Sequence, residues 1–212
     1  MDEKEYFSCQ AENLKKLPNL PKYLKYLDCS FNELDNIEIL PITLIELNCR
    51  NNNLVLLPEL PNGLIYLNCV QNKLTELSIL SYSLQYLYCN YNNLILLPEL
   101  PETLIELDCC QNNISILPQL HNSLEKLNIS NNNISILPQL PNTLIELYCN
   151  YNNISILPQL PNTLELLWCK NNNIKYLSLE NLQIIKNVRY IDLLNNPVSI
   201  NFNDNTEFIN QI

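Results

Sequence analysis

One frame of eleven residues returns every twenty residues along most of this chain. Segment 24–34 reads L-x-x-L-x-C-x-x-N-x-L, and the frame recurs in eight consecutive copies. Its second leucine stands at Leu27, Leu47, Leu67, Leu87, Leu107, Leu127, Leu147 and Leu167. Its asparagine stands at Asn32, Asn52, Asn72, Asn92, Asn112, Asn132, Asn152 and Asn172. A repeat of this length forms one structural unit per copy, and the stacked units make a solenoid with a continuous core.

Divergent copies flank the regular repeats. C-terminal to them, a ninth copy includes Ile191 and Asn196, and Ile191 follows Leu167 by 24 residues (191 − 167). N-terminal to them, a degenerate copy is present at Cys9 and Leu14. End repeats have only one neighbour and need caps. We therefore expect an N-terminal cap and degenerate repeat in 1–23, eight repeats in 24–174, and a divergent last repeat with a C-terminal cap in 175–212.

Within one repeat, residue types alternate with a period of two. Leu27 and Cys29 point inward, whereas Tyr26, Asp28 and Ser30 point outward. This alternation is typical of a short strand. Stacked copies then form a parallel sheet.

The other half of each repeat contains two proline columns. One is Pro18, Pro58, Pro98, Pro118, Pro138 and Pro158, and the other is Pro21, Pro41, Pro61, Pro101, Pro141 and Pro161. Because proline fixes φ and lacks an N–H, two per repeat exclude a regular helix and favour extended or polyproline-II backbone on the convex side. We expect helix only at 178–187, where Ser178 can cap and Leu182 and Ile185 can pack, and at 204–212.

Eight cysteines share one inward column. They are Cys9, Cys29, Cys49, Cys69, Cys89, Cys109, Cys149 and Cys169, and Ile129 and Leu193 take the same place in two copies. A position that accepts isoleucine is apolar and buried, where a thiol has a raised pKa and little reactivity. Strands ~4.8 Å apart leave a disulfide open as an alternative, and metal capture by the row is another. We expect free thiols and no metal or cofactor, because a linear row with one histidine, His121, offers no tetrahedral site. His121 replaces a proline and should lie on the convex side.

Cys110 lies outside that column, at an outward position. A catalytic cysteine needs a base or a positive neighbourhood to form a thiolate, and the nearby charges, Glu106 and Asp108, are negative. With one histidine, one glycine and no nucleophile–base pair, the chain is predicted not to be an enzyme.

The asparagine column is interpreted as structural. A buried amide has two donors and an acceptor, so it can satisfy backbone groups where each strand turns away from the sheet.

Charge and composition exclude several partner classes. The net charge is −10, and segment 74–125 contains no lysine or arginine, so the middle of the molecule is acidic and nucleic acid is not an expected partner. No run reaches the roughly eighteen apolar residues of a membrane span. The polar start of the chain lacks a signal peptide, which predicts an intracellular, cytoplasmic protein.

Segment 57–61 reads L-P-E-L-P, and with the frame described above it resembles the leucine-rich-repeat family. The resemblance is to its short bacterial-effector class, which usually has an aliphatic residue in place of Cys29, Cys49 and Cys69. It implies a leucine-rich-repeat solenoid of the α/β horseshoe superclass, built mainly from short parallel strands. Some effectors carry a separate ubiquitin-ligase domain, for which this chain has no room. The scarcity of Gly and Ala beside abundant Asn, Ile and Tyr is similar to leucine-rich-repeat proteins of giant viruses of amoebae.

The outward strand positions hold the candidate binding residues. Tyr26, Tyr66, Tyr86, Tyr88, Tyr91, Tyr148, Tyr151 and Tyr190 fall on this concave face, together with Trp168 and Phe31. Asp28, Glu46, Glu106, Asp108 and Glu146 lie among them. Tyr and Trp are common interface anchors, and carboxylates select a basic partner. The predicted site comprises two patches, one of Tyr86, Tyr88, Tyr91, Glu106 and Asp108 and one of Tyr148, Tyr151 and Trp168.

The leading hypothesis is a protein-interaction module, favoured as a monomer, whose partner is a protein with a basic surface. In another interpretation, the rings only stabilise the sheet by cross-strand packing. Segment 87–93, L-Y-C-N-Y-N-N, recurs unchanged at 147–153, so duplication also explains the tyrosines. A host-modulating adaptor or effector of a pathogen or virus, and a structural particle component, are the remaining alternatives.

Overall fold

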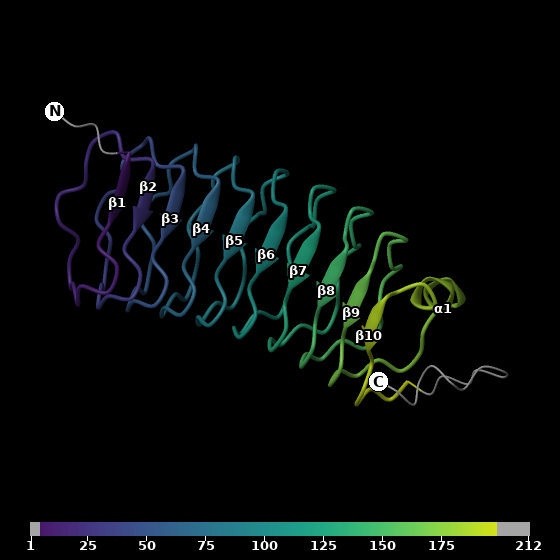
Figure 1. Ribbon diagram of the computed structural model, residues 1–212. Coiled ribbons are helices and arrows are strands. Elements are labelled where there is room, and N and C mark those ends of the chain that lie inside the picture. The colour runs from purple at the N-terminus through teal and green to yellow at the C-terminus, as the bar shows by residue number, and fades with distance from the viewer. Residues whose placement is uncertain (1–4, 199–212) are drawn as a thin grey trace.

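The computed structural model describes residues 5–198, which form a curved solenoid with ten short parallel strands stacked side by side (Figure 1). The strands are β1 (Tyr6–Ser8), β2 (Tyr26–Asp28), β3 (Glu46–Asn48), β4 (Tyr66–Asn68), β5 (Tyr86–Tyr88), β6 (Glu106–Asp108), β7 (Lys126–Asn128), β8 (Glu146–Tyr148), β9 (Leu166–Trp168) and β10 (Tyr190–Asp192). Their order in the sheet is their order in the chain. The expected solenoid of short parallel strands with little helix is confirmed.

The strand register follows the sequence repeat. Leu27 pairs with Leu47, and Leu47 pairs with Leu67. The last pairing, of Leu167 with Ile191, spans the longer interval, which the helix α1 (Leu179–Ile185) takes up. At the other end Phe7 pairs with Leu27, so the degenerate first copy contributes a complete strand of the sheet.

The core fills the inside of every coil with the same leucine columns. In the coil of β3, Leu44, Leu47 and Leu54 have no exposed surface, and Leu57 and Leu60 are also buried. The cluster runs without a break from Cys9 to Ile174. Because burial of apolar area is the main stabilising contribution, each coil depends on its two neighbours for most of its stability.

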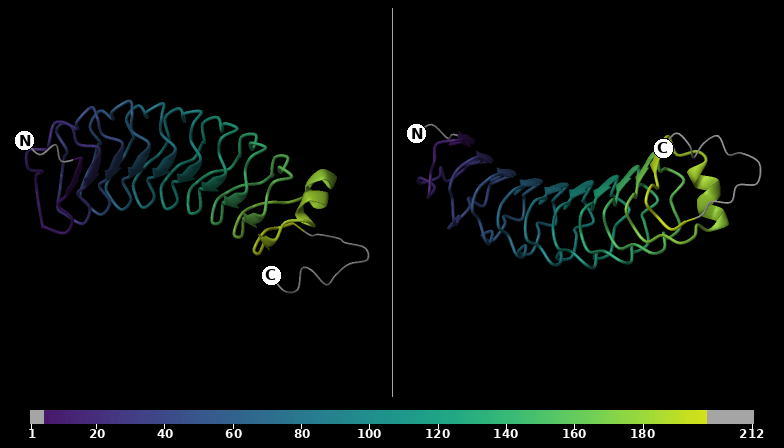
Figure 2. Two further views of the ribbon diagram at one scale, coloured as in Figure 1. Left: turned by 45° about the horizontal axis from the view of Figure 1, so that its top comes forward. Right: turned by 90° about the horizontal axis from the view of Figure 1, so that it is seen from below.

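The strands line the inner side of the arc, and the connecting segments form its outer side (Figure 2). In the connections the carbonyl of Pro41 accepts a hydrogen bond from the Leu44 N–H at 3.1 Å. His121 takes the proline's place in one repeat, and its carbonyl accepts from Leu124 N at 3.1 Å. The regular repeats contain no helix, as the proline columns predict. Within residues 5–198, no helix is long and apolar enough to cross a bilayer.

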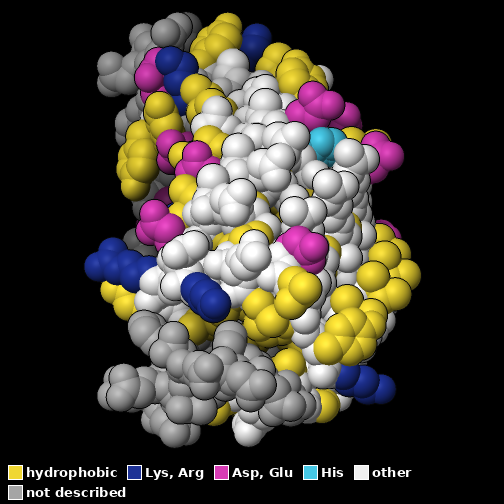
Figure 3. All heavy atoms as spheres, turned by 90° about the vertical axis from the view of Figure 1, so that its right-hand side faces the viewer, with side chains coloured by type: hydrophobic (Ala, Val, Ile, Leu, Met, Phe, Trp, Pro, Cys, Tyr) yellow, Lys and Arg dark blue, Asp and Glu magenta, His cyan; other side chains and the backbone are white. Residues whose placement is uncertain are grey.

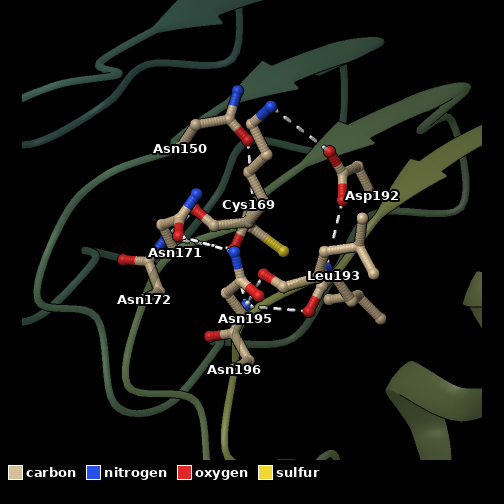
Figure 4. Close-up of polar contacts among 10 residues, drawn as sticks. Asn150, Cys169, Asn171, Asn172, Asp192, Leu193, Asn195 and Asn196 are labelled. Atoms are coloured by element: carbon tan, nitrogen blue, oxygen red, sulfur yellow. Dashed lines mark hydrogen bonds and ion pairs between the residues drawn. The ribbon is translucent and has the colours of Figure 1, made fainter. Parts of the chain in front are cut away.

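The eight asparagines of the repeat frame form a row of hydrogen bonds that we call the asparagine ladder. Asn92 Nδ2 donates to the carbonyls of Cys69 at 3.0 Å and Cys89 at 3.1 Å, and Asn92 Oδ1 accepts from Leu74 N at 2.9 Å. One amide therefore ties two coils together at three backbone groups. Asn172 and Asn196 repeat the pattern at the end of the solenoid (Figure 4). The structural interpretation of this column is confirmed.

A second row of hydrogen bonds was not recognised from the sequence. The Thr103 hydroxyl donates to the carbonyl of Leu84 at 2.8 Å, and the same bond recurs one coil at a time elsewhere. This hydroxyl ladder consists of Thr43, Thr103, Ser123, Thr143 and Thr163. Gly63 and Ser83 occupy the two corresponding places between Thr43 and Thr103.

The cysteine column is buried, and all nine cysteines are free thiols. Burial raises the pKa of Cys69 to about 12 and that of Cys89 well above its usual value. Cys110 is only partly buried, and its pKa is raised to about 12 by that burial and by the adjacent Asp108 carboxylate. An activated nucleophile requires a lowered pKa, the opposite of the shifts at Cys69, Cys89 and Cys110.

The helix α1 lies where the sequence predicts one. The Ser178 hydroxyl caps it by accepting from Asn181 N at 3.1 Å. Ile184 and Ile185 pack against the core, so Ile184 takes the packing role expected for Leu182. The predicted helix at 204–212 lies outside the described residues. The buried Asn181 amide accepts from Leu160 N and donates to the Pro158 carbonyl, both at 2.8 Å, which fixes the helix to the preceding coil.

Gly63→Thr should raise the free energy of unfolding by about 1 kcal/mol, because it restricts the unfolded chain and restores a hydroxyl to the ladder. A Cβ at this position meets no atom within 4 Å, and the backbone φ is not positive. Urea denaturation followed by circular dichroism measures the change. Gly63→Ala separates the two contributions, and a threonine variant no more stable than the alanine variant would contradict a role for the hydroxyl.

Asn92→Ala is expected to destabilise the protein by about 1–3 kcal/mol, because it leaves buried backbone groups without partners. The neighbouring Asn93 is exposed, so Asn93→Ala is the matched control. Thermal unfolding of the two variants compares them directly. Equal melting temperatures would reject the structural role of the asparagine ladder.

The folded protein should show no rapidly reacting thiol toward Ellman's reagent at pH 8. The eight column cysteines are buried, and a pKa of about 12 leaves roughly one Cys110 side chain in ten thousand as thiolate at that pH. All nine should react after denaturation in guanidinium. Fast labelling of the native protein that disappears in Cys110→Ser would show that the Cys110 thiol is activated.

Candidate binding face

The concave face consists of the outward side chains of the strands, in two columns. The first column is Tyr6, Tyr26, Glu46, Tyr66, Tyr86, Glu106, Lys126, Glu146, Leu166 and Tyr190, and the second is Ser8, Asp28, Asn48, Asn68, Tyr88, Asp108, Asn128, Tyr148, Trp168 and Asp192. Seen along the solenoid from its C-terminal end, acidic side chains stand among hydrophobic ones at the strand-bearing edge, on the left of Figure 3. Tyr6 belongs to this face, although the sequence prediction omitted it. Its distance of twenty residues from Tyr26, one repeat length, would have placed it in the same column.

The first predicted patch is a group of tyrosines on neighbouring coils, here called the tyrosine cluster: Tyr66, Tyr86, Tyr88 and Tyr91. The ring of Tyr66 lies 5.5 Å from that of Tyr88 and 6.4 Å from that of Tyr86, measured between ring centres. These three side chains are half-buried, whereas Tyr91 is 54% exposed. The prediction left Tyr66 outside the patch. The Tyr66 ring packs against both of the other rings, so these outward side chains are partly engaged within the sheet.

A shallow depression of about 530 Å³ lies at the tyrosine cluster. Its lining residues are Arg50, Tyr66, Asn68, Val70, Gln71, Tyr88, Asn90, Tyr91 and Asp108. Two of the three predicted tyrosines and one of the two predicted carboxylates therefore border a single hollow. A smaller depression of about 190 Å³ lies beside it on β6 to β8, with Glu106, Lys126, Glu146 and Tyr148 among its lining residues.

The two carboxylates of β6 stand directly opposite the tyrosines of β5. Glu106 pairs with Tyr86, and Asp108 pairs with Tyr88. Burial raises the pKa of Tyr88, and the Glu106 carboxylate raises it further. Burial also raises the pKa of Asp108, against the opposing effect of the hydrogen bond that it accepts from Cys110 N at 3.0 Å. Neither carboxylate takes part in an ion pair within residues 5–198.

The second predicted patch is held by contacts of its own. The rings of Tyr148 and Trp168 meet edge to face at 5.3 Å, and the Tyr148 hydroxyl donates to Glu146 at 3.1 Å. Lys126 Nζ lies 3.2 Å from Glu146 Oε1 and interrupts the acidic face between the two patches. Lys170 Nζ lies 5.6 Å from the centre of the Tyr151 ring. The aromatic side chains of this patch are thus largely engaged within the chain.

A third column follows the strands, and its residues have a left-handed backbone without being glycine. Its members in the regular repeats are Phe31, Asn51, Gln71, Tyr91, Gln111, Asn131, Tyr151 and Asn171, with φ between 53° and 56°. This conformation is unfavourable for most side chains, and asparagine tolerates it best. Tyr91 therefore occupies a position where asparagine, present in three other repeats, would cause less strain.

A separate apolar column lies four residues after each of Asn92, Asn112, Asn132 and Asn152. It contains Leu96, Ile116, Ile136 and Ile156, which are 50–75% exposed. These side chains are not part of the concave face, and they provide a comparison surface of similar hydrophobicity.

No protein-family model and no curated protein sequence matches the chain. Among solved structures, YopM from Yersinia enterocolitica is 34% identical with a TM-score of 0.75, over 88% of this chain and 45% of its own. A leucine-rich-repeat domain of a Shigella effector is 29% identical with a TM-score of 0.57, over 84% of this chain and 74% of its own. The functional domain of InlJ from Listeria monocytogenes, which includes a cysteine ladder, is 28% identical with a TM-score of 0.77, over 91% of this chain and 44% of its own.

The chain thus spans less than half the length of YopM and InlJ. Its own buried cysteine column parallels the cysteine ladder of InlJ. The TM-scores show that the fold described above is shared with the matched parts of YopM and of the InlJ domain. By its fold, the chain is a leucine-rich-repeat solenoid built from twenty-residue repeats.

Proposed function

We propose that this chain is an intracellular protein-interaction module whose concave face binds a protein with a basic surface. The observation that carries the proposal is the depression at the tyrosine cluster, where exposed aromatic surface adjoins Asp108, a carboxylate that takes part in no ion pair within residues 5–198. Its likeness to other leucine-rich-repeat structures supports an interaction role.

Aromatic anchors and unpaired carboxylates have complementary roles in an interface. Tyrosine buries a large area with only two rotatable side-chain bonds, and its hydroxyl tolerates a wet rim. Glu106 and Asp108 would attract a positively charged partner and disfavour an acidic one. With a net charge of −10, this surface favours a basic protein over a phosphate backbone.

Stabilisation of the sheet accounts for only part of the tyrosine cluster. Mutual packing explains Tyr66, Tyr86 and Tyr88, whose rings are in contact. It does not explain Tyr91, which is 54% exposed and has a left-handed backbone with φ of 56°. A strained residue retained with an exposed ring is more consistent with a contact outside the chain.

A second candidate is a host-modulating effector of a pathogen or virus, acting as an adaptor without chemistry of its own. The similarity to YopM and to the Shigella effector domain favours it. It differs from the leading proposal in the origin of the partner, which would be a host protein.

Affinity capture from a cell lysate should recover a set of proteins that Tyr86→Ala/Tyr88→Ala/Tyr91→Ala loses. The control variant is Ile116→Ser/Ile136→Ser, which removes exposed apolar area elsewhere on the solenoid. Quantitative mass spectrometry compares the three baits. Proteins retained by the control and lost by the tyrosine variant support the proposal, and a set unchanged in both variants contradicts it.

The single variant Tyr91→Asn excludes misfolding as the cause of a loss. Because asparagine suits a left-handed backbone, this variant should be at least as stable as the wild type. It should nevertheless bind the captured protein more weakly. Undiminished binding would show that Tyr91 is not an anchor.

A further inference from the structure

Two of the three aromatic side chains in the left-handed column already face a cation of the chain. The Arg50 guanidinium lies 5.5 Å from the centre of the Phe31 ring, and Lys170 Nζ lies 5.6 Å from that of Tyr151. In both cases the cation belongs to the residue after the column cysteine of the next coil. The corresponding residue for Tyr91 is Cys110, a neutral thiol. Within residues 5–198, no cation lies over the Tyr91 ring.

The adjacent carboxylate, Asp108, lacks the cation that Asp192 has. Three aspartates stand in the second column of the concave face. Asp28 accepts a side-chain hydroxyl at 2.6 Å, and Asp192 lies 4.0 Å from Lys170 Nζ. Asp108 accepts the backbone N–H of Cys110, and no ion pair within the described range includes it. A partly buried carboxylate without a cation is costly, and a cation supplied from outside would offset that cost.

An amide oxygen at the same depression has no donor. In the duplicated segment, Asn150 Oδ1 accepts from Lys170 N at 3.0 Å. The equivalent donor for Asn90 is Cys110 N, which donates to Asp108 instead. Asn90 Oδ1 is consequently a buried acceptor without a hydrogen-bond partner among residues 5–198. Such orphaned groups are uncommon in folded proteins, and an external donor would satisfy this one after a local shift of the Asn90 side chain that exposes the oxygen.

The Tyr91 ring and the Asp108 carboxylate lack a cation of the chain, and Asn90 Oδ1 lacks a hydrogen-bond donor. All three residues border one depression. We propose that the depression at Tyr91, Asp108 and Asn90 binds one arginine side chain of the partner protein. This inference rests on the proposed function, because it specifies the chemistry by which the concave face recognises a basic surface.

Arginine fits better than lysine for a geometric reason. A planar guanidinium can stack on the Tyr91 ring while its N–H groups donate to Asp108 and toward Asn90. These acceptors belong to adjacent coils, whose strands are ~4.8 Å apart, a separation that a fork of donors can span. An ammonium group is a compact charge and reaches fewer of these partners at once.

The chain's own Arg50 cannot occupy this position without a large rearrangement. It lies three coils from Asp108, which corresponds to ~14 Å along the sheet, and its guanidinium is held over Phe31. The site is therefore open to an arginine from another protein.

An NMR titration of ¹⁵N-labelled protein with N-acetyl-arginine amide tests the site without knowledge of the partner. The backbone signals of Asn90, Tyr91 and Cys110 should shift and saturate. N-acetyl-lysine amide should bind several-fold more weakly, and N-acetyl-citrulline amide, which has a similar shape but no charge, should not bind measurably. Equal effects of arginine and citrulline would overturn the proposal.

Variants locate the binding. Asp108→Asn should weaken N-acetyl-arginine amide binding roughly ten-fold. Cys110→Arg should place a cation of the chain over Tyr91, as Arg50 does over Phe31, and thereby prevent probe binding in a folded protein. Glu102→Gln removes one exposed charge from a connecting segment outside the concave face and should leave the affinity unchanged. Wild-type affinity in Asp108→Asn or in Cys110→Arg would overturn the proposal.

Captured partners distinguish failure of this site from failure of the proposed function. A partner lost by the tyrosine variant but retained by Asp108→Asn would overturn the arginine site and leave the proposed function intact. A probe that binds as described, with no protein captured through the concave face, would support the site and contradict the proposed function.

Discussion

The hydrogen bonds of the asparagine ladder hold the chain where each three-residue strand ends and the backbone turns away from the sheet. A strand this short has few ladder bonds of its own, and the turn leaves backbone groups inside the coil that water cannot reach. Each amide satisfies groups in two successive coils, so it closes one turn and joins it to the next. Without that bond, the leucine columns would have no fixed geometry in which to stack.

The cysteine column follows from the same constraint. Its carbonyls accept hydrogen bonds from the ladder amides, which brings the backbone close together there and leaves room for a small apolar side chain. Isoleucine at Ile129 is accommodated in the same place and is fully buried. The thiols are thus components of the packing, and their raised pKa values are a consequence of burial. The repeat leaves the residue type free in the outward columns, which hold the candidate binding residues.

The architecture could be predicted because a strict period of twenty residues fixes which positions are neighbours. The core columns, the strand register, the turn at His121 and the cap at Ser178 all followed from spacing and residue type.

The hydroxyl ladder was missed because threonine and serine give no signal of burial on their own. Leu182 was expected to pack where Ile184 does, because the sequence of a seven-residue helix determines poorly which of its sides faces the core. Ser30 was expected to face outward, yet it is fully buried, and its hydroxyl donates to the Asp28 carboxylate at 2.6 Å. At the candidate site, the pairing of Glu106 and Asp108 with the tyrosines follows from the period. The contacts of Tyr66 and the positions of Arg50, Lys126 and Lys170 depend on side-chain rotamers, which the period leaves undetermined.

Because every regular pairing is a shift of twenty residues, whole repeats can be exchanged by recombination without breaking the sheet. Segments 87–93 and 147–153 share the sequence L-Y-C-N-Y-N-N, so the same cassette stands at two places. In one copy the following coil brings Lys170 over the ring, and in the other it brings Cys110. A tyrosine in a duplicated repeat can therefore have a cation of the chain over its ring or lack one, depending on a single residue of the following coil. In a solenoid of this kind, new specificity can arise from the order of the modules as well as from their sequence.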